Sequence, residues 1–314
     1  MPANLKDLKS RIKSVMTTQQ MTKAMKLVSA AKFTRAQQTL GATREYSQSY
    51  EASLADLLQL AFIKEDNPFF SGSPKQGFPV HLVLSSDRGL CGGYNGSLAK
   101  LVLKKTEDKD DKKSTFLFIG KKVFQTFIRK VDLKARDMEV KTVSVEEFCA
   151  HAKEILKPNK AILIQPQESS GAKLPLKVLE KFVKALHEVF LTEELSGLDV
   201  TFNKFQTAMS QIPTQTMLFP IQRPEHSEAG TFLTEGAPED ELLQEFIPLF
   251  LQQKLFWMMC EAQTSEHGSR MTAMDSATKN AKEMERKLNI TYQRARQAAI
   301  TKELIEIISG AEAL

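Results

Sequence analysis

The feature that most constrains this sequence is a seven-residue repeat of small and apolar side chains near its C-terminal end. Between Met274 and Ile305, two interleaved sets of positions recur every seven residues and together alternate three and four residues apart. This alternation is typical of the seam of a left-handed coiled coil. Alanine is its most frequent residue, so a partner helix can approach closely and the rod is slender. The predicted seam consists of Met274, Ala277, Ala281, Met284, Leu288, Thr291, Ala295, Ala298 and Ile305.

The N-terminal segment predicts a second long helix. Its apolar stripe runs from Leu5 to Val15, is interrupted by the polar Thr17–Gln20, and resumes over Met21–Ala31 with a shift in phase. No glycine precedes Gly41 and no helix-breaking proline lies in the segment, so we expect helix to about Phe62. Such a helix is roughly 85 Å long, too long to lie within an ordinary globular core.

The C-terminal helix is predicted to start after Pro238, where three acidic residues follow. We expect Pro248 to split off a short first piece. The pattern then continues from Leu249 to Ser309, about 90 Å, and Gly310 should end it. Both terminal stripes are too narrow for a large core, so the economical solution is an antiparallel pair.

The middle of the chain alternates short apolar runs with helical patterns, which is typical of a mainly parallel sheet covered on both faces. The predicted fold class is therefore α/β: an antiparallel coiled coil of long N- and C-terminal helices plus a central α/β domain. We predict an N-terminal shaft helix at 1–66, the α/β domain at 67–237 and a C-terminal shaft helix at 238–314. Strands are expected at 80–86, 116–120, 141–145 and 160–164, with extended edge segments at 200–206 and 215–221.

Composition narrows the function classes. Residues 1–44 carry nine basic side chains and one acid, which favours an acidic or phosphate-rich partner as much as a solvated face. No apolar run is long enough to span a membrane, and no secretory signal precedes the pattern. The three cysteines are too scattered for a disulfide framework or a zinc site. Aromatic residues do not alternate with the basic ones, so nucleic acid is not an expected partner.

The glycine-rich segment Ser85–Asn95 resembles a strand-to-helix turn that could cradle phosphate. However, the spacing of Gly89, Gly92 and Gly93 fits neither the dinucleotide-binding fingerprint nor the P-loop. A structural turn or a partner-contact loop is favoured. Cys91 lies in this turn, but the histidines form no pattern with it that would make it a nucleophile. We therefore expect no catalytic residue, no cofactor and no metal site.

Three segments together resemble one family. Lys9–Gln37 (KSRIKSVMTTQQMTKAMKLVSAAKFTRAQ), Ser85–Asn95 (SSDRGLCGGYN) and Arg270–Leu314 are similar to the gamma subunit of the F-type rotary, proton-translocating ATP synthase. The resemblance covers both ends and the central turn, in the right order. Residues 104–260 share only the pattern of strands and helices. The resemblance implies the same architecture, with a Rossmann-like domain that holds no nucleotide.

The resemblance also implies a role and partners. A gamma subunit is the central shaft, without a catalytic site of its own, whose tip stands within a ring of three alpha and three beta subunits. Its foot lies with the epsilon subunit on the ring of c subunits. Proton flow turns the shaft, which forces each beta subunit through states of different nucleotide affinity. The implied location is the cytoplasmic face of the bacterial inner membrane, as a peripheral protein.

Carried over by position, the residues implied to meet the catch loops of beta are Met25, Lys26, Arg88, Cys91, Arg296, Gln297 and Thr301. Met25 and Lys26 are expected at the same level of the shaft as the last three. No role is assigned to Lys104–Lys113 or to residues 222–238. Two other classes remain open from the residues alone: a nucleotide-dependent α/β enzyme with helical extensions, and a coiled-coil adaptor.

Overall fold

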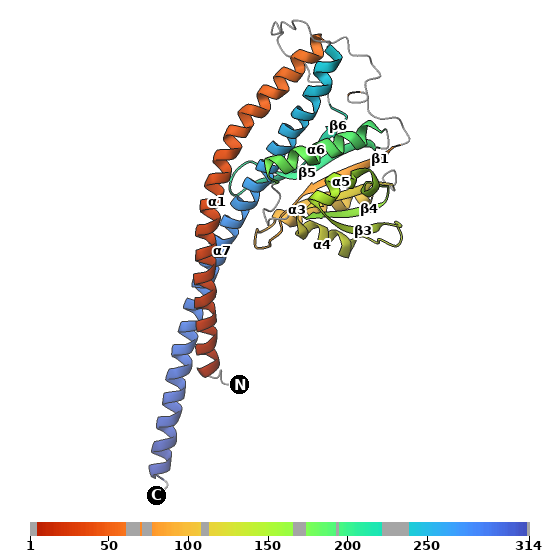
Figure 1. Ribbon diagram of the computed structural model, residues 1–314. Coiled ribbons are helices and arrows are strands. Elements are labelled where there is room, and N and C mark those ends of the chain that lie inside the picture. The colour runs from red at the N-terminus through yellow and green to blue at the C-terminus, as the bar shows by residue number, and fades with distance from the viewer. Residues whose placement is uncertain are drawn as a thin grey trace. The chain divides into compact units, whose positions relative to one another are not determined.

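The computed structural model describes residues 5–60, 70, 77–107, 113–165, 174–192, 195–221 and 239–312. Two long helices, α1 (Leu5–Leu60) and α7 (Glu239–Glu312), flank the sheet-forming part of the sequence (Figure 1). The chain forms two compact units, which we call unit 1 (residues 1–31 and 270–314) and unit 2 (residues 32–269). Each long helix contributes to both units, whereas the division predicted at residues 66 and 238 assigned each helix wholly to a shaft.

Unit 2 contains a six-stranded sheet whose strands are ordered β3-β4-β2-β1-β5-β6. All neighbouring strands pair in parallel except β5 and β6, which are antiparallel. Central strands such as β1 and β2 are buried along almost their whole length because both faces of the sheet are covered. The predicted α/β class is confirmed. The strands are β1 (Phe78–Leu84), β2 (Thr115–Ile119), β3 (Glu139–Ser144), β4 (Lys160–Gln165), β5 (Leu195–Phe205) and β6 (Gln211–Phe219).

Two hydrophobic clusters hold the helices onto the sheet. One contains Phe116 and Phe118 of β2 together with apolar side chains of α3 (Tyr94–Thr106) and α4 (Lys121–Lys130). The other contains side chains of α5 (Val145–Ile155) and α6 (Leu176–Leu191), joined by the part of α7 around Leu255. Alternate residues of each buried strand therefore serve different clusters, as the pleat requires.

The structure corrects two expectations about α7 and one about the sheet. The helix is not split at Pro248, because the neighbouring Ile247 and Phe250 are buried in the core and their packing outweighs one lost hydrogen bond. It also continues through Gly310 to Glu312. The segment that begins near Val200 is not at an edge: β5 lies between β1 and β6, and the outermost strands of the sheet are β6 and β3. The predicted linker at 222–238 lies outside the described residues.

Candidate functional site

The α1 side of the helix pair in unit 1 keeps a three-four spacing with no change of phase. The predicted shift is wrong: Met21 and Val28, which were to resume the stripe, are about 60% exposed. Polar side chains occupy the inward positions instead. The seam residues therefore change from apolar to polar, while their three-four spacing is kept. The buried and half-buried positions include Leu5, Leu8, Ile12, Val15, Gln19, Thr22, Lys26 and Ser29.

On the α7 side of unit 1, one predicted set of seam positions is buried and the other is displaced by one residue. The first set, Met274, Ala281, Leu288 and Ala295, is buried or half-buried. In the second set, Ala277 is half-buried, but Met284 and Ile305 are 54% and 58% exposed, and Thr291 and Ala298 are exposed as well. A narrow seam accepts the aliphatic or aromatic parts of longer polar side chains. Its half-buried members are Thr278, Glu285, Tyr292 and Ala299.

Polar contacts join the two helices of unit 1. The Lys26 ammonium lies 2.5 Å from one oxygen of Asp275, and Lys279 lies 2.8 Å from the other. The hydroxyls of Thr22 and Thr278 are 2.8 Å apart and hydrogen-bond to each other. The hydrogen bonds from Lys26 and Lys279 lower the pKa of Asp275 to about 2, because they stabilise its ionised form.

These contacts correct the expected level of Met25 and Lys26. Lys26 lies opposite Asp275, and Arg296 lies 21 residues further along α7. At 1.5 Å per residue that is about 30 Å along the helix axis. Met25 and Lys26 are therefore not at the level of Arg296, and any contact they make with a partner is a separate one.

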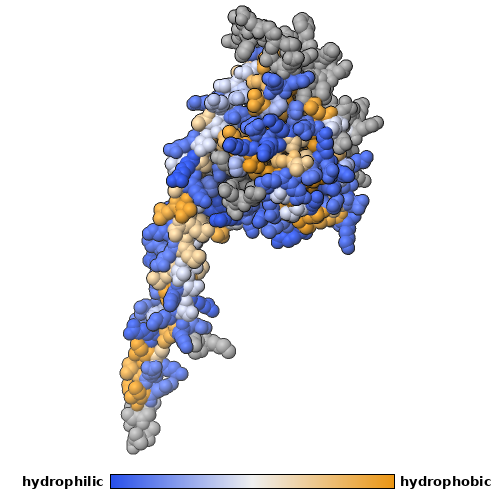
Figure 2. All heavy atoms as spheres, viewed as in Figure 1, coloured by the Kyte–Doolittle hydropathy of each residue, from blue (hydrophilic) through white to orange (hydrophobic). Residues whose placement is uncertain are grey.

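The end of α7 carries both polar and apolar exposed side chains. Arg296, Gln297 and Thr301 are exposed, and the Thr301 hydroxyl donates to the Gln297 carbonyl. Large apolar side chains beside them are also exposed, and Figure 2 shows them as a patch toward the C-terminal end of α7. A contiguous exposed apolar surface of this kind is typical of an interaction site. Its members are Ile300, Leu304, Ile305, Ile307 and Ile308.

In unit 2, the turn between β1 and α3 is fixed against the end of β2. The Ser85 N–H donates to the Ile119 carbonyl at 2.8 Å, and the Ser85 hydroxyl donates to the Gly120 carbonyl at 2.9 Å. Gly120 has a φ of 105°, and a Cβ there would collide with the Ser85 carbonyl oxygen. Only glycine fits this junction.

The same turn occupies the N-terminus of α4. The N–H of Lys121 donates to the Asp87 carboxylate at 3.2 Å, and the N–H of Lys122 donates to the Ser86 carbonyl at 3.1 Å. Amides at such a helix start can bind an anion when they are exposed. Here two of them already have acceptors within the chain, so the turn acts as a structural junction.

The tip of the turn is exposed, whereas Cys91 is buried. Arg88 is exposed, and Leu90 is 60% exposed with a φ of 63°, an unusual conformation for a leucine. The Cys91 side chain is only 2% exposed, and its sulfur accepts a hydrogen bond from the Asn95 amide at 3.0 Å. The Ser269 hydroxyl of α7 donates to the Cys91 carbonyl at 2.7 Å. Cys91 thus holds the turn in place, and the surface is formed by its neighbours.

Comparison with known proteins decides what these features belong to. A family model described as ATP synthase matches residues 4–314. The ATP synthase gamma chain of Pelagibacter ubique is 37% identical over 315 residues, covering 99% of this chain and 100% of the relative. The gamma chain of Rhodospirillum rubrum is 33% identical over 323 residues, with the same coverage. The chain belongs to the ATP synthase gamma chain family.

Solved structures share the fold. A chain from the Euglena gracilis mitochondrial ATP synthase, OSCP/F1/c-ring, covers 98% of this chain and 94% of its own length, with a TM-score of 0.62 and 15% identity. A chain from the Tetrahymena thermophila mitochondrial ATP synthase, central stalk/c-ring, covers 82% and 99%, with a TM-score of 0.52 and 18% identity. The predicted family is confirmed: gamma chains are non-catalytic stalk subunits, and their role is that of the rotor shaft.

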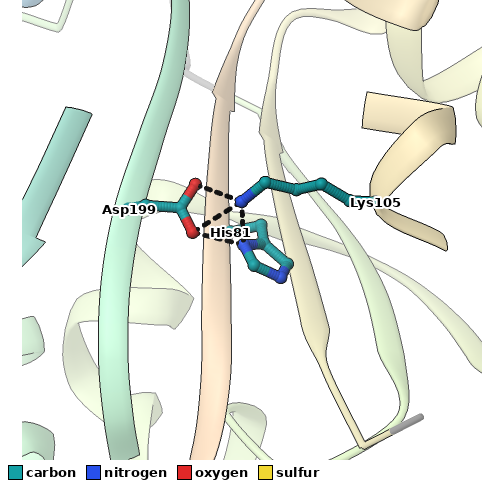
Figure 3. A network of polar contacts seen from close by, with 3 residues as sticks. All are labelled: His81, Lys105 and Asp199. Carbon is teal, nitrogen blue, oxygen red and sulfur yellow. Dashed lines mark hydrogen bonds and ion pairs between the residues drawn. The ribbon is translucent and has the colours of Figure 1, made fainter. Parts of the chain in front are cut away.

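One feature of this gamma chain was not predicted from its sequence. His81 of β1, Asp199 of β5 and Lys105 of α3 form a polar network in unit 2 (Figure 3). The His81 Nδ1 lies 2.5 Å from Asp199 Oδ1, and the Lys105 ammonium lies 2.8 Å from both Asp199 oxygens. The Lys105 ammonium also lies 2.8 Å from the His81 Nδ1, so Nδ1 either donates to Asp199 or accepts from Lys105, depending on the tautomer. The network ties the end of α3 to two strands.

A signal for this network is present in the sequence. His81 and Asp199 each interrupt an apolar strand, and a buried charge in such a strand requires a partner. Strand pairing then sets the two residues side by side, since His81 and Asp199 are direct neighbours in the β1–β5 register.

Two other kinds of functional feature are absent from the described part of the chain. Among those residues, no group of three or more His, Cys, Asp or Glu side chains is arranged to hold a metal ion. None of the described helices has a stretch both long and apolar enough to cross a bilayer.

Proposed function

We propose that this chain couples rotation of a c-ring to conformational cycling of catalytic beta subunits in ATP synthesis and hydrolysis. Its partners would be an alpha3-beta3 hexamer, an epsilon subunit and the c-ring, at the cytoplasmic face of the bacterial inner membrane. The observation that carries this proposal is unit 1. In a gamma chain, a slender antiparallel helix pair with exposed apolar and basic side chains is suited to turn within an enclosing ring.

The proposed contacts with beta lie at two levels of unit 1 and at one turn of unit 2. At the end of α7 they are Arg296, Gln297 and Thr301, which are exposed. Some 30 Å away along the pair are Met25 and Lys26, both half-buried. In the turn after β1 the proposed contact is Arg88, and the buried Cys91 holds the turn in its conformation.

Weak contacts suit this function. Exposed ion pairs and hydrogen bonds contribute about 0–1 kcal/mol each, so none would hold the shaft at one angle. An asymmetric shaft that meets three beta subunits in turn can favour a different conformation of each, because its contacts differ between their states. Excess Lys and Arg on α1 would match acidic loops on the ring.

The test is a pair of matched double variants in the assembled complex. Arg296→Ala with Gln297→Ala should lower ATP hydrolysis and its coupling to proton transport. Gln293→Ala with Arg294→Ala removes the same two side-chain types from exposed positions one turn away, and should have a smaller effect. Equal activity of the two variants, with unchanged helicity by circular dichroism, would remove Arg296 and Gln297 from the proposed contact.

A further inference from the structure

The middle of the helix pair in unit 1 has an unusual distribution of side chains. Its seam holds the polar Thr22, Lys26 and Ser29, while Met21 and Leu27 on the same helix are more than 60% exposed. Burial of apolar surface therefore contributes little to the pairing of the two helices here. Arg44 and Glu261 align the same two helices in unit 2. Within unit 1, a feature other than apolar burial must distinguish one alignment of α1 and α7 from its neighbours.

A small-residue seam does not select this alignment by packing alone. The heptad repeat brings equivalent seam positions together again when one helix slides by seven residues, about 10 Å. On α7, Ala281, Ala295 and Ala299 offer similar shallow surfaces at several levels. The larger seam side chains, among them Leu8 of α1 and Leu288 of α7, also stand at heptad positions, so a pair slipped by seven residues still sets seam positions opposite seam positions. Polar residues at seam positions are the usual means by which coiled coils fix their alignment.

The polar contacts of unit 1 are specific to the observed alignment. Lys26 faces Asp275 at 2.5 Å. Seven residues in one direction it would face Lys282, a like charge, and seven in the other it would face Gly268, which has no side chain. A slip in either direction therefore removes its carboxylate partner.

The neighbouring hydroxyl pair is specific to this alignment in one direction. The Thr278 hydroxyl donates to the Thr22 hydroxyl at 2.8 Å, and the corresponding slipped partners of Thr22 are Met271 and Glu285. A slip toward Met271 removes this hydrogen bond together with the ion pair, whereas a slip toward Glu285 removes the ion pair and leaves Thr22 facing a carboxylate.

We propose that Lys26 with Asp275 and Thr22 with Thr278 form a register lock, a device that sets the lengthwise alignment of α1 against α7 in unit 1. Lys279 assists by holding the second oxygen of Asp275, which orients the carboxylate toward α1. The lock adds selectivity more than stability, since a partly exposed ion pair is weak in absolute terms. One consequence rests on the proposed function: two helices that cannot slide past each other carry torque as one rod.

Disulfide trapping in the full-length chain tests the lock without reference to rotation. Thr22→Cys with Thr278→Cys reports the observed alignment, because their hydroxyls are already in contact. Thr22→Cys with Glu285→Cys reports a slip of seven residues. Mild oxidation, followed by gel shift and peptide mapping against Cys91, Cys149 and Cys260, measures each crosslink. In the otherwise unchanged chain we expect the first crosslink to form and the second to be minor.

Removing the ion pair should change the ratio of the two crosslinks. Lys26→Ala with Asp275→Ala is expected to raise the slipped crosslink relative to the aligned one about five-fold, the factor supplied by an exposed ion pair at the upper end of its usual strength. Lys23→Ala, an exposed lysine of the same helix outside the seam, should leave the ratio unchanged. An unchanged ratio in the double variant, or an equal shift in Lys23→Ala, would overturn the lock. Neither result bears on the beta contacts proposed above.

Discussion

The same two helices pair in both units of this gamma chain, but different forces hold them. In unit 2 the pair rests on the sheet: Leu255 and Met258 of α7 are fully buried in the main core. The buried Glu261 accepts hydrogen bonds from the Phe205 N–H of β5 and from Arg44 of α1. In unit 1 the described helices have only each other, and their seam is narrow and partly polar. A heptad pattern thus specifies that helices pair, while stability comes from what lies beside them.

The largest expected difference is between Asp199 of unit 2 and Asp275 of unit 1, each of which forms an ion pair with a lysine. Asp199→Asn in unit 2 leaves Lys105 without its carboxylate in a buried site, which should cost about 3–5 kcal/mol of unfolding free energy. Asp275→Asn in unit 1 affects an exposed pair, so we expect a much smaller loss. Chemical denaturation of both variants measures the difference. Equal losses of unfolding free energy in the two variants would show that the network of His81, Lys105 and Asp199 does not hold α3 to the sheet.

The second comparison concerns apolar side chains of α7. Leu255→Ala in unit 2 removes a fully buried side chain and should destabilise the chain by about 2–5 kcal/mol. Leu304→Ala in unit 1 removes a side chain that is 54% exposed, and should change stability by less than about 0.5 kcal/mol in the free chain. In an assembled complex the difference in stability loss between the two variants should become smaller, because a partner would cover Leu304. Pulse proteolysis of the free and assembled chains checks both statements.

Two helical glycines of unit 2 provide a smaller and opposite pair of effects. Gly41 of α1 has nothing within 4 Å of an added Cβ, so Gly41→Ala should stabilise the chain by about 1 kcal/mol. At Gly268 of α7, the new Cβ would lie 3.2 Å from the Phe33 ring and 3.4 Å from Ala208. Gly268→Ala should therefore gain nothing or lose stability, as read from thermal unfolding. A similar gain at both sites would mean that Phe33 moves aside freely.

The smallest effect is a dependence on pH that belongs to unit 1. The pKa of Asp275 is lowered to about 2 on folding, from an ordinary value of about 3.9, by its bonds to Lys26 and Lys279. Its ionised form therefore stabilises the fold above about pH 4, and this contribution is lost as the pH falls toward 2.

Asp275→Asn should accordingly lower the thermal midpoint at neutral pH, and this difference should disappear as the pH falls through about 2. Glu283→Gln, whose pKa is also lowered but whose partner Lys287 lies on the same helix, is the control for a bond that does not join α1 to α7. The interpretation fails if the difference between Asp275→Asn and the unchanged chain persists at the lowest pH. Helical circular dichroism gives the midpoints.

Much of the fold could be predicted from the sequence because apolar periodicity reports local structure directly. The runs that form β2 and β4 hold continuous apolar residues, and the run of β1 is interrupted at His81. The helices that follow these strands show a clear buried face. The prediction failed where polar side chains occupy positions whose spacing belongs to the seam. Thr17–Gln20 was interpreted as a change of phase because seam positions were assumed to be apolar, yet Gln19 and Thr22 occupy the seam.

The candidate site was less predictable because it depends on contacts across the chain. Lys26 was carried over as a partner contact, and no local pattern indicates that its ammonium lies on Asp275. Pro248 was expected to break α7, since its local effect is unfavourable, but core packing on either side outweighs it. For Arg296, Gln297 and Thr301, exposure agrees with a surface role, and which partner they meet stays a prediction.

The turn after β1 and the first residue of α3 are both hydrogen-bonded to α7: the Ser269 hydroxyl donates to the Cys91 carbonyl, and the Tyr94 hydroxyl donates to the Ala262 carbonyl. Two hydrogen bonds to different turns of one helix restrain rotation of the turn about either bond, which a single hydrogen bond would allow. Leu90, exposed at the tip of this turn, is therefore held near a stretch of α7 about two turns long.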